Sequence, residues 1–160
     1  MQSTAIQSDM LQLVTFKLDG QKYAVDILKV QEINNMKEIT SIPNAPVYLE
    51  GAINLRGKVI PVLNLRKKFG FDDNPKSELC KIIIMDVRGV IMGLIVDAVS
   101  DVLRINQDVV EPPPPVSSNV SSEFISGIAK LSEGLIILLD MDRLLDAEEH
   151  RIVFGEAQVS

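Results

Sequence analysis

The sequence predicts a mainly β fold, made of two related units and followed by one C-terminal helix. Three observations support this prediction: an internal repeat, short segments of alternating apolar and polar residues between turn signals, and helical spacing after residue 140. At 160 residues the chain is long enough for one ordinary domain, or for two small units that share a core.

The internal repeat consists of two blocks. Residues 13–33 align without a gap on residues 82–102, and residues 48–69 align on residues 124–145. The two offsets differ by seven residues, and the extra residues lie in the second connector. That connector includes the run 111–116, Glu-Pro-Pro-Pro-Pro-Val, which predicts a rigid, extended polyproline segment rather than a PxxP ligand.

The repeat places turns and apolar positions in register, since Gly51 meets Gly127 in the alignment. We expect the two repeats to cover about residues 12–72 and 81–146. Each is roughly 60 residues long, a size that is marginal alone and gains stability by packing on its twin.

The first predicted strands form a hairpin. Apolar and polar residues alternate through residues 14–19, and Asp19-Gly20 is a strong hairpin turn signal before a second strand at 23–25. We expect Val14 and Phe16 to face the core.

The next segment predicts a short helical turn and then a second hairpin. In residues 27–33 apolar side chains recur every three residues, which favours a helical turn that leads into a strand. The apolar runs 52–55 and 59–63 are joined around Gly57, which supplies the positive φ that such a turn needs. Because Pro61 cannot donate a hydrogen bond, its strand is predicted to be an edge strand, or its nitrogen faces away from a partner.

The last segment predicts a C-terminal helix that packs on the β units. Asp140 or Asp142 can cap it, and the opposite face carries Asp146, Glu148 and Glu149. The apolar stripe consists of Leu144, Leu145, Ala147 and Ile152.

Composition excludes several classes of protein. The net charge of -6 at pH 7 argues against a nucleic-acid surface, and we interpret the basic run 66–68 as a solvated turn or helix face. The N-terminus lacks the pattern of a signal peptide, and the apolar runs are far shorter than the roughly 18 residues of a membrane span. With Cys80 as the only cysteine, an internal disulfide is impossible, which suits the cytoplasm.

The sequence also lacks the residues of an enzyme site. His150, the only histidine, lies in a charged segment without a nucleophile motif, and we expect it to be solvated. No glycine-rich phosphate loop and no metal-ligand cluster is present, so we expect no cofactor and no metal. Glu32 and Asp101 occupy matched positions of the two repeats, but equivalent sites of related units usually lie on separate surfaces.

Three segments carry a resemblance to a known family: DILKVQEI (26–33), GAINLRGKVIPV (51–62) and GLIVDAVSDVL (93–103). Together they resemble the blocks of the CheW family of chemotaxis coupling proteins and of the CheW-like regulatory domain of CheA kinases. The resemblance runs over about residues 11–147 and implies two five-stranded SH3-like β-barrels, which can exchange strands. It leaves 1–10 and 155–160 as flexible termini, without room for a CheA kinase core or a CheV receiver domain.

The resemblance implies a non-enzymatic adaptor in the cytoplasm, recruited to membrane receptor arrays without direct membrane insertion. Its expected partners are the cytoplasmic tip of a methyl-accepting chemotaxis receptor and the regulatory domain of a CheA-type histidine kinase. The receptor-binding positions carried over from the family are Val30, Glu32 and Arg56, with Val99 as a plausible far wall. The kinase-binding positions are Ile39, Val59 and, for a second contact that closes a ring, Val116.

Two alternatives remain open at this stage. One is a CheW-like scaffold of a signalling array outside chemotaxis, which the sequence does not distinguish from a chemotaxis adaptor. The other is a small-molecule-binding β-barrel, which would require a deep polar pocket, whereas an adaptor should present shallow apolar patches ringed by charge.

Overall fold

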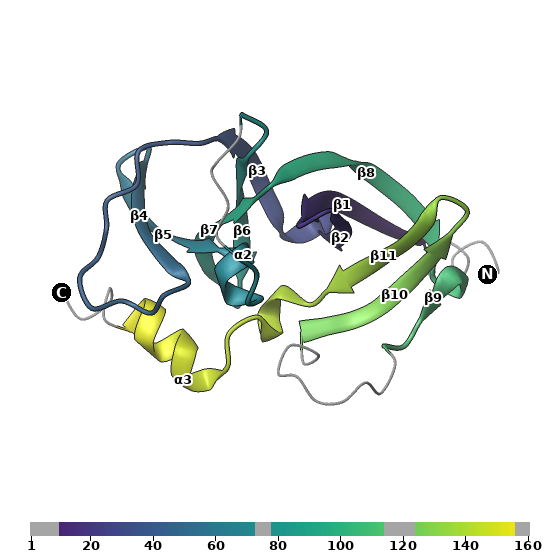
Figure 1. Cartoon of the computed structure of the whole chain (residues 1–160). Helices are drawn as coiled ribbons and strands as arrows, with labels where there is room; N and C mark the ends of the chain where they lie inside the picture. The colour runs from purple at the N-terminus through teal and green to yellow at the C-terminus, as the bar shows by residue number, and fades with distance from the viewer. Residues whose placement is uncertain (1–9, 73–77, 114–123, 156–160) are drawn as a thin grey trace.

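The computed structural model describes residues 10–72, 78–113 and 124–155. Two curved sheets stand side by side and are linked by short helical segments (Figure 1). The mainly β architecture with two subdomains is therefore as predicted. Most of the expected flexible ends, 1–10 and 155–160, lie outside the described residues, but Met10 begins the first strand and Gly155 ends the last helical segment.

We call the six-stranded sheet, with the segments that follow its strands, the larger subdomain. The five-stranded sheet, with the segments that follow its strands, is the smaller subdomain. The larger sheet has the order β8-β1-β2-β11-β10-β9, and the smaller sheet has the order β3-β6-β7-β5-β4. The strands of the larger sheet are β1 (Met10–Leu18), β2 (Gln21–Asp26), β8 (Ala98–Asn106), β9 (Val110–Glu111), β10 (Ile125–Leu131) and β11 (Gly134–Leu139). Those of the smaller sheet are β3 (Val30–Asn35), β4 (Leu49–Leu55), β5 (Lys58–Asn64), β6 (Lys81–Val87) and β7 (Val90–Val96). The two-residue β9 gives the larger sheet one strand more than the five expected.

Six short helical segments are assigned among the described residues, where they connect or follow these strands. They are η1 (Ile27–Lys29), α2 (Leu65–Lys68), η2 (Gln107–Val109), η4 (Met141–Arg143), α3 (Ala147–His150) and η5 (Arg151–Gly155). None of the helices in the described part of the chain combines the length and the apolar content that crossing a membrane requires.

Each sheet combines strands from both sequence repeats. The hairpin β1–β2 of the first repeat lies in the larger sheet, whereas β3, β4 and β5 of the same repeat lie in the smaller one. The hairpin β6–β7 of the second repeat lies in the smaller sheet, whereas the other strands of that repeat lie in the larger one. Parallel pairs, β2 with β11 and β7 with β5, join each exchanged hairpin to the other repeat. The two subdomains are therefore interlocked by the chain itself.

A central core lies between the sheets. Phe16 and Leu18 of the larger sheet and Met85 and Leu94 of the smaller sheet are fully buried in one shared apolar cluster. Each sheet also encloses a cluster of its own on its other face. The marginal size of each repeat is thus offset by apolar surface that both subdomains bury together.

The two predicted hairpin turns are confirmed. Asp19 and Gly20 both have positive φ, 53° and 83°, and Arg56 and Gly57 repeat this geometry with 52° and 86°. Positive φ at both central residues is the geometry that suits the right-handed twist of a two-residue hairpin. The predicted helical turn before β3 is also present, as η1.

Of the two alternatives predicted for Pro61, the edge strand is wrong, whereas a nitrogen without a ladder partner agrees with the pairing. β5 pairs with β4 on one side and with β7 on the other. The register with β7 begins at Val62, one residue after Pro61, so the proline precedes the ladder that its missing N–H would have interrupted.

The C-terminal helix differs from the prediction in its cap and its apolar face. Asp140 caps only the short η4, and α3 begins after Asp146. There Asp146 and Glu149 form a reciprocal capping box, in which each backbone N–H donates to the other carboxylate, at 3.0 and 2.7 Å. The π-helical geometry of η5 turns Ile152 outward and buries Val153 instead.

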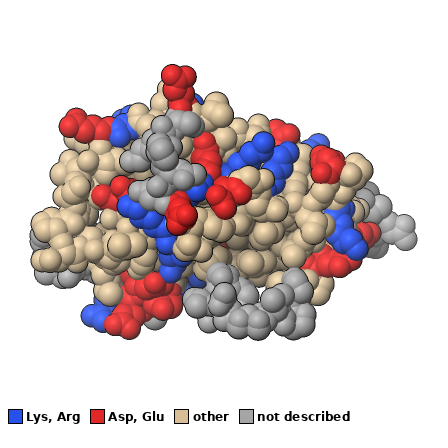
Figure 2. All heavy atoms as spheres, viewed as in Figure 1, with Lys and Arg blue, Asp and Glu red and all other residues tan. Residues whose placement is uncertain are grey.

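The basic run 66–68 is not solvated as interpreted above. Arg66 is buried, and each of the three side chains forms an ion pair with a different part of the fold. Lys67 pairs with Glu50 at 2.9 Å and Lys68 pairs with Glu149 at 2.8 Å. In Figure 2 the basic side chains over α2 lie beside an acidic group over α3, and the partners of the run explain this arrangement.

Candidate functional site

An ion pair joins β3 to the tip of the β4–β5 hairpin. Arg56 lies in the turn, and both terminal nitrogens of its guanidinium face the carboxylate of Glu32. The Asn54 side chain accepts a hydrogen bond from the Gly57 N–H at 2.9 Å, which holds the turn in place. The strand and the turn therefore fix the fork-to-fork geometry that Arg and a carboxylate prefer.

The pair remains ionised and accessible near neutral pH. The hydrogen bond from Arg56 is the largest cause that lowers the pKa of Glu32, and the same contact raises the pKa of Arg56. The Arg56 side chain is 71% exposed and that of Glu32 is 27% exposed. A partner can thus reach the cation while the carboxylate orients it.

An open groove of about 440 Å³ begins at Arg56. Its walls come from β5 and from the β6–β7 hairpin, with Val59, Pro61 and Val90 among the apolar side chains. Val59 is 78% exposed and lies in the part of β5 that pairs with β4 alone, because the pairing with β7 begins only at Val62. Arg56 and Val59, predicted for different partners, therefore line one groove.

The two valines predicted for the receptor lie on different subdomains. Val30 belongs to β3 and Val99 to β8, and each is a partly buried residue packed against the central core. Both strands are edge strands of their sheets. Val30 and Val99 thus contribute to the core and also border the junction between the subdomains.

The remaining kinase-binding predictions fall in different places. Ile39 lies in the β3–β4 loop and packs partly against the cluster enclosed by the smaller sheet. Val116 lies outside the described residues. Ile39 and Val59 therefore both belong to the smaller subdomain.

The larger subdomain contains an open cavity of about 670 Å³, which bears on the small-molecule alternative. Leu13, Ala24 and Leu138 form its base, and Leu28, 86% exposed, stands at its rim. The carboxylate of Asp26 at this rim already accepts the backbone N–H of Leu28, at 2.9 Å. Lys29, Arg104 and Asp140 also line the cavity, which therefore combines an apolar base with charged side chains.

Other candidates for chemistry are dispersed. His150 is half-buried in α3 rather than solvated, and Cys80 is partly exposed just before β6. Among the described residues, no group of three or more His, Cys, Asp or Glu side chains could hold a metal ion.

Comparison with known proteins bears on this geometry. A family model described as a CheW-like domain matches residues 12–149. The chain belongs to the CheW-like family.

Relatives and a solved structure agree with the family model. The chemotaxis protein CheW of Klebsiella aerogenes is 34% identical over 92% of this chain and 89% of its own length. The chemotaxis protein CheW of Thermotoga maritima is 34% identical over 84% of this chain and 87% of its own length. The crystal structure of the scaffolding protein TtCheW from Thermoanaerobacter tengcongensis is 41% identical, covers 87% of this chain and 94% of its own, and has a TM-score of 0.80.

Sequence reasoning about this CheW-like chain missed the structural role of Asp101. The Thr15 hydroxyl oxygen lies 2.6 Å from the Asp101 carboxylate and 2.9 Å from the Asp101 carbonyl oxygen, either of which can accept its one proton, and it accepts the Asp101 N–H at 3.0 Å. Thr15 is completely buried, so Asp101 satisfies a polar group inside the sheet. The repeat alignment contained an indication of this role, because it matches the polar Thr15 of the first repeat with the apolar Ile84 of the second.

Proposed function

We propose that this chain is a non-enzymatic chemotaxis adaptor, which couples the cytoplasmic tip of methyl-accepting receptors to a CheA-type histidine kinase. In this role it works in the cytoplasm and is recruited to receptor arrays at the membrane. The observation that carries the proposal is the oriented Glu32–Arg56 pair at the end of an exposed apolar groove, on a chain of the CheW-like family.

The receptor surface in this proposal extends from Arg56 and Glu32 to Val30 and Val99. A receptor tip is a helical hairpin, and helices are bound by apolar surfaces whose rim charges set their orientation. The Arg56 guanidinium is exposed and held by a carboxylate, which leaves its outer edge for acidic or carbonyl groups of a partner.

The kinase surface in this proposal lies on the smaller subdomain, around Val59 and Ile39, with Val116 assigned to a second contact. Val59 supplies an apolar side chain that no residue of the chain covers fully. Because Arg56 and Val59 line one groove, the two partner surfaces adjoin there and separate away from it.

Titration of two charge variants with both partners tests the proposal. We expect Arg56→Asp to weaken binding of a receptor fragment by about tenfold or more, with little change for the kinase regulatory domain. We expect Val59→Asp to do the opposite, because a carboxylate buried in an apolar contact loses its hydration without gaining a partner.

Arg151→Asp is the matched control, since Arg151 is also exposed and the charge change is the same. It should leave both affinities within about twofold of the unaltered protein. Circular dichroism establishes folding of each variant before calorimetry. Equal loss of both partners by the two folded variants would refute the assignment of separate surfaces.

A further inference from the structure

A buried arginine connects the two subdomains. Arg66 lies in α2, directly after β5 of the smaller sheet. Its guanidinium donates to Asp97 at 2.5 Å, to Asp19 at 3.1 Å and to the carbonyl oxygen of Asp72 at 2.8 Å. Asp19 lies in the β1–β2 turn of the larger sheet, and Asp97 lies where the chain passes from β7 to β8. The N–H of Asp19 also donates to the Asp97 carboxylate, at 2.9 Å.

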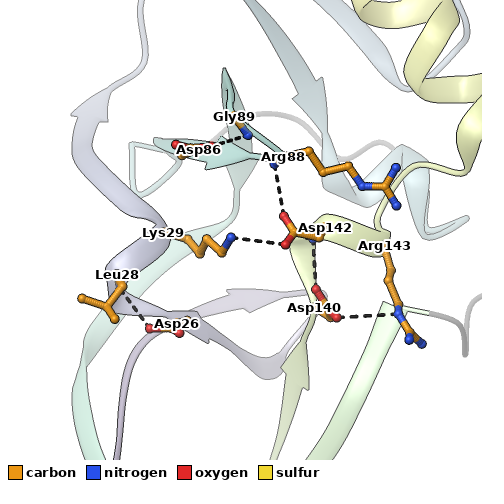
Figure 3. Close-up of polar contacts among 9 residues, drawn as sticks. All are labelled: Asp26, Leu28, Lys29, Asp86, Arg88, Gly89, Asp140, Asp142 and Arg143. Atoms are coloured by element: carbon orange, nitrogen blue, oxygen red, sulfur yellow. Dashed lines mark hydrogen bonds and ion pairs between the residues drawn. The ribbon is translucent and has the colours of Figure 1, made fainter.

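The second repeat makes the same connection with reversed charge. Asp142 of η4 occupies the position that Arg66 occupies in the first repeat. Its carboxylate accepts Lys29 of η1 at 3.2 Å and the backbone N–H of Arg88 at 3.2 Å (Figure 3). Arg88 lies in the β6–β7 turn and corresponds to Asp19 in the repeat. In both repeats the segment after the last strand therefore holds a hairpin turn of the other subdomain.

The two connections differ in burial, which decides their relative strength. The Arg66 side chain is 8% exposed and that of Asp97 is 29% exposed, whereas those of Lys29 and Asp142 are 40% and 38% exposed. Solvent screens an exposed pair, and such a pair contributes little to a structure. Asp19, the second carboxylate partner of Arg66, is 52% exposed, so the buried charge of this connection is the guanidinium, and removing its partners leaves that charge uncompensated. Of the two polar connections, that of Arg66 therefore contributes more to the junction, beside the apolar core that the subdomains share.

The proposed receptor surface spans this junction, whereas the proposed kinase surface does not. Val30 is on the smaller subdomain and Val99 is on the larger one, while Ile39 and Val59 are both on the smaller. A change in the angle between the subdomains would separate Val30 from Val99 without altering Val59.

We infer that Arg66, with Asp19 and Asp97, is a positioning clamp that fixes the angle between the subdomains and so aligns the two halves of the receptor surface. The inference rests on the proposed receptor surface for its binding consequence. Its geometric consequence, a fixed angle, concerns the chain alone.

Two variants of different severity test the clamp. Arg66→Met keeps the length of the side chain but removes its charge and its donors. Asp97→Asn is nearly isosteric and removes only the negative charge, since its amide oxygen can take the place of the one carboxylate oxygen that accepts both Arg66 and the Asp19 N–H. Lys29→Met removes the exposed connection of the second repeat and serves as the matched control.

The first measurement is the distance distribution between spin labels on the two subdomains. Labels at Lys58→Cys, at the start of β5, and at Glu133→Cys, in the β10–β11 turn, both exposed, are introduced after Cys80→Ser removes the native thiol. We expect Arg66→Met and Asp97→Asn to broaden or shift the distribution relative to the unaltered chain, and Lys29→Met to leave it unchanged.

The second measurement is titration of each unlabelled variant with a receptor fragment and with the kinase regulatory domain. We expect Arg66→Met to weaken receptor binding by about tenfold, or about 1.4 kcal/mol, and to leave kinase binding within about twofold. Arg66→Lys should restore little of the receptor affinity. The ammonium group of lysine cannot bridge Asp19, Asp97 and the Asp72 carbonyl oxygen as the planar guanidinium does. If Arg66 only stabilised the fold, Arg66→Met would lower the melting temperature but would not affect receptor binding more than kinase binding.

The outcomes separate the clamp from the proposed function. Unchanged distances in both folded clamp variants, or equal losses for both partners, overturn the positioning role. If Arg66→Met does not fold, Asp97→Asn decides the question by the same two measurements. If the unaltered chain does not bind receptor, the proposed function fails, while broadened distances still support the clamp.

Discussion

Gly51→Ala is predicted to be far more damaging than its small size suggests. Gly51 lies at a register shift in the β4–β5 pair, with a φ of +152° that is essentially restricted to glycine. A Cβ at this position would lie 2.1 Å from the carbonyl oxygen of Thr40 and 2.9 Å from a methyl carbon of Ile39. The closest contact is backbone, so it cannot be relieved by rotating a side chain.

The magnitude follows from what must move. Thr40 and Ala52 exchange two backbone hydrogen bonds, both 2.9 Å long, and displacing the β3–β4 loop breaks them. Each bond contributes about 1 kcal/mol net, and backbone strain at a glycine-only φ adds about 1–3 kcal/mol. We expect Gly51→Ala to lower the free energy of unfolding by about 3–5 kcal/mol. It should also move Ile39, and therefore weaken kinase binding.

Gly57→Ala is the matched control. Gly57 also has positive φ, +86°, but a Cβ there meets nothing within 4 Å. Only the conformational penalty remains, about 1–2 kcal/mol. Urea unfolding followed by circular dichroism gives the free energy of unfolding of both variants. The two values are compared at equal dependence on denaturant concentration. A fall for Gly51→Ala no larger than that for Gly57→Ala would refute the argument from close contact.

Two predictions concern titration. Because Arg56 lowers the pKa of Glu32 below its ordinary value of 4.5, the pair stabilises the fold above that value, and this contribution is lost as the pH falls through the lowered pKa. Urea unfolding should show a stability difference between Glu32→Gln and the unaltered protein that is constant near pH 7 and disappears in acid. Burial, with Asp19 and Glu149 as further causes, raises the pKa of Tyr23 and of Tyr48. Absorbance at alkaline pH should therefore show no tyrosinate near pH 10 until the protein unfolds, and folding stability should fall as the pH rises above that value.

Features set by neighbouring residues were predictable from the sequence. Asp19-Gly20 and Arg56-Gly57 specify their turns locally, and the repeat alignment matches strand to strand, since β4 and β10 begin and end at equivalent positions. The Glu32–Arg56 contact is different, because periodicity does not indicate which charges meet across a fold. Its residues came from family resemblance, and the geometry of the pair came from the structure.

Features that depend on distant segments were not predictable. The basic run 66–68 has the composition of a solvated helix face, yet Arg66 is buried because Asp19 and Asp97 arrive from elsewhere in the chain. The sequence predicted the helix cap at Asp140 or Asp142, because several aspartates there can accept a backbone N–H. In the structure the chain bends after η4, and Asp146 caps the helix. The prediction of an edge strand at Pro61 was wrong because strand exchange brings β7 alongside β5.

Divergence between the repeats explains why the Glu–Arg pair occurs on the smaller subdomain. Glu32 and Asp101 occupy equivalent positions beside equivalent strands, but Asp101 faces Thr15 whereas Glu32 pairs in register with Ile84. The Thr15 hydroxyl is a hydrogen-bond donor for the exposed aspartate, whereas Ile84 has no donor to offer the glutamate. Arg56 supplies that donor from the hairpin tip, where the second repeat has Ser132, a residue too short to reach. One repeated strand edge thus carries an aspartate bound to a buried threonine in the larger subdomain and a Glu–Arg ion pair in the smaller one, where the guanidinium stays exposed to a partner.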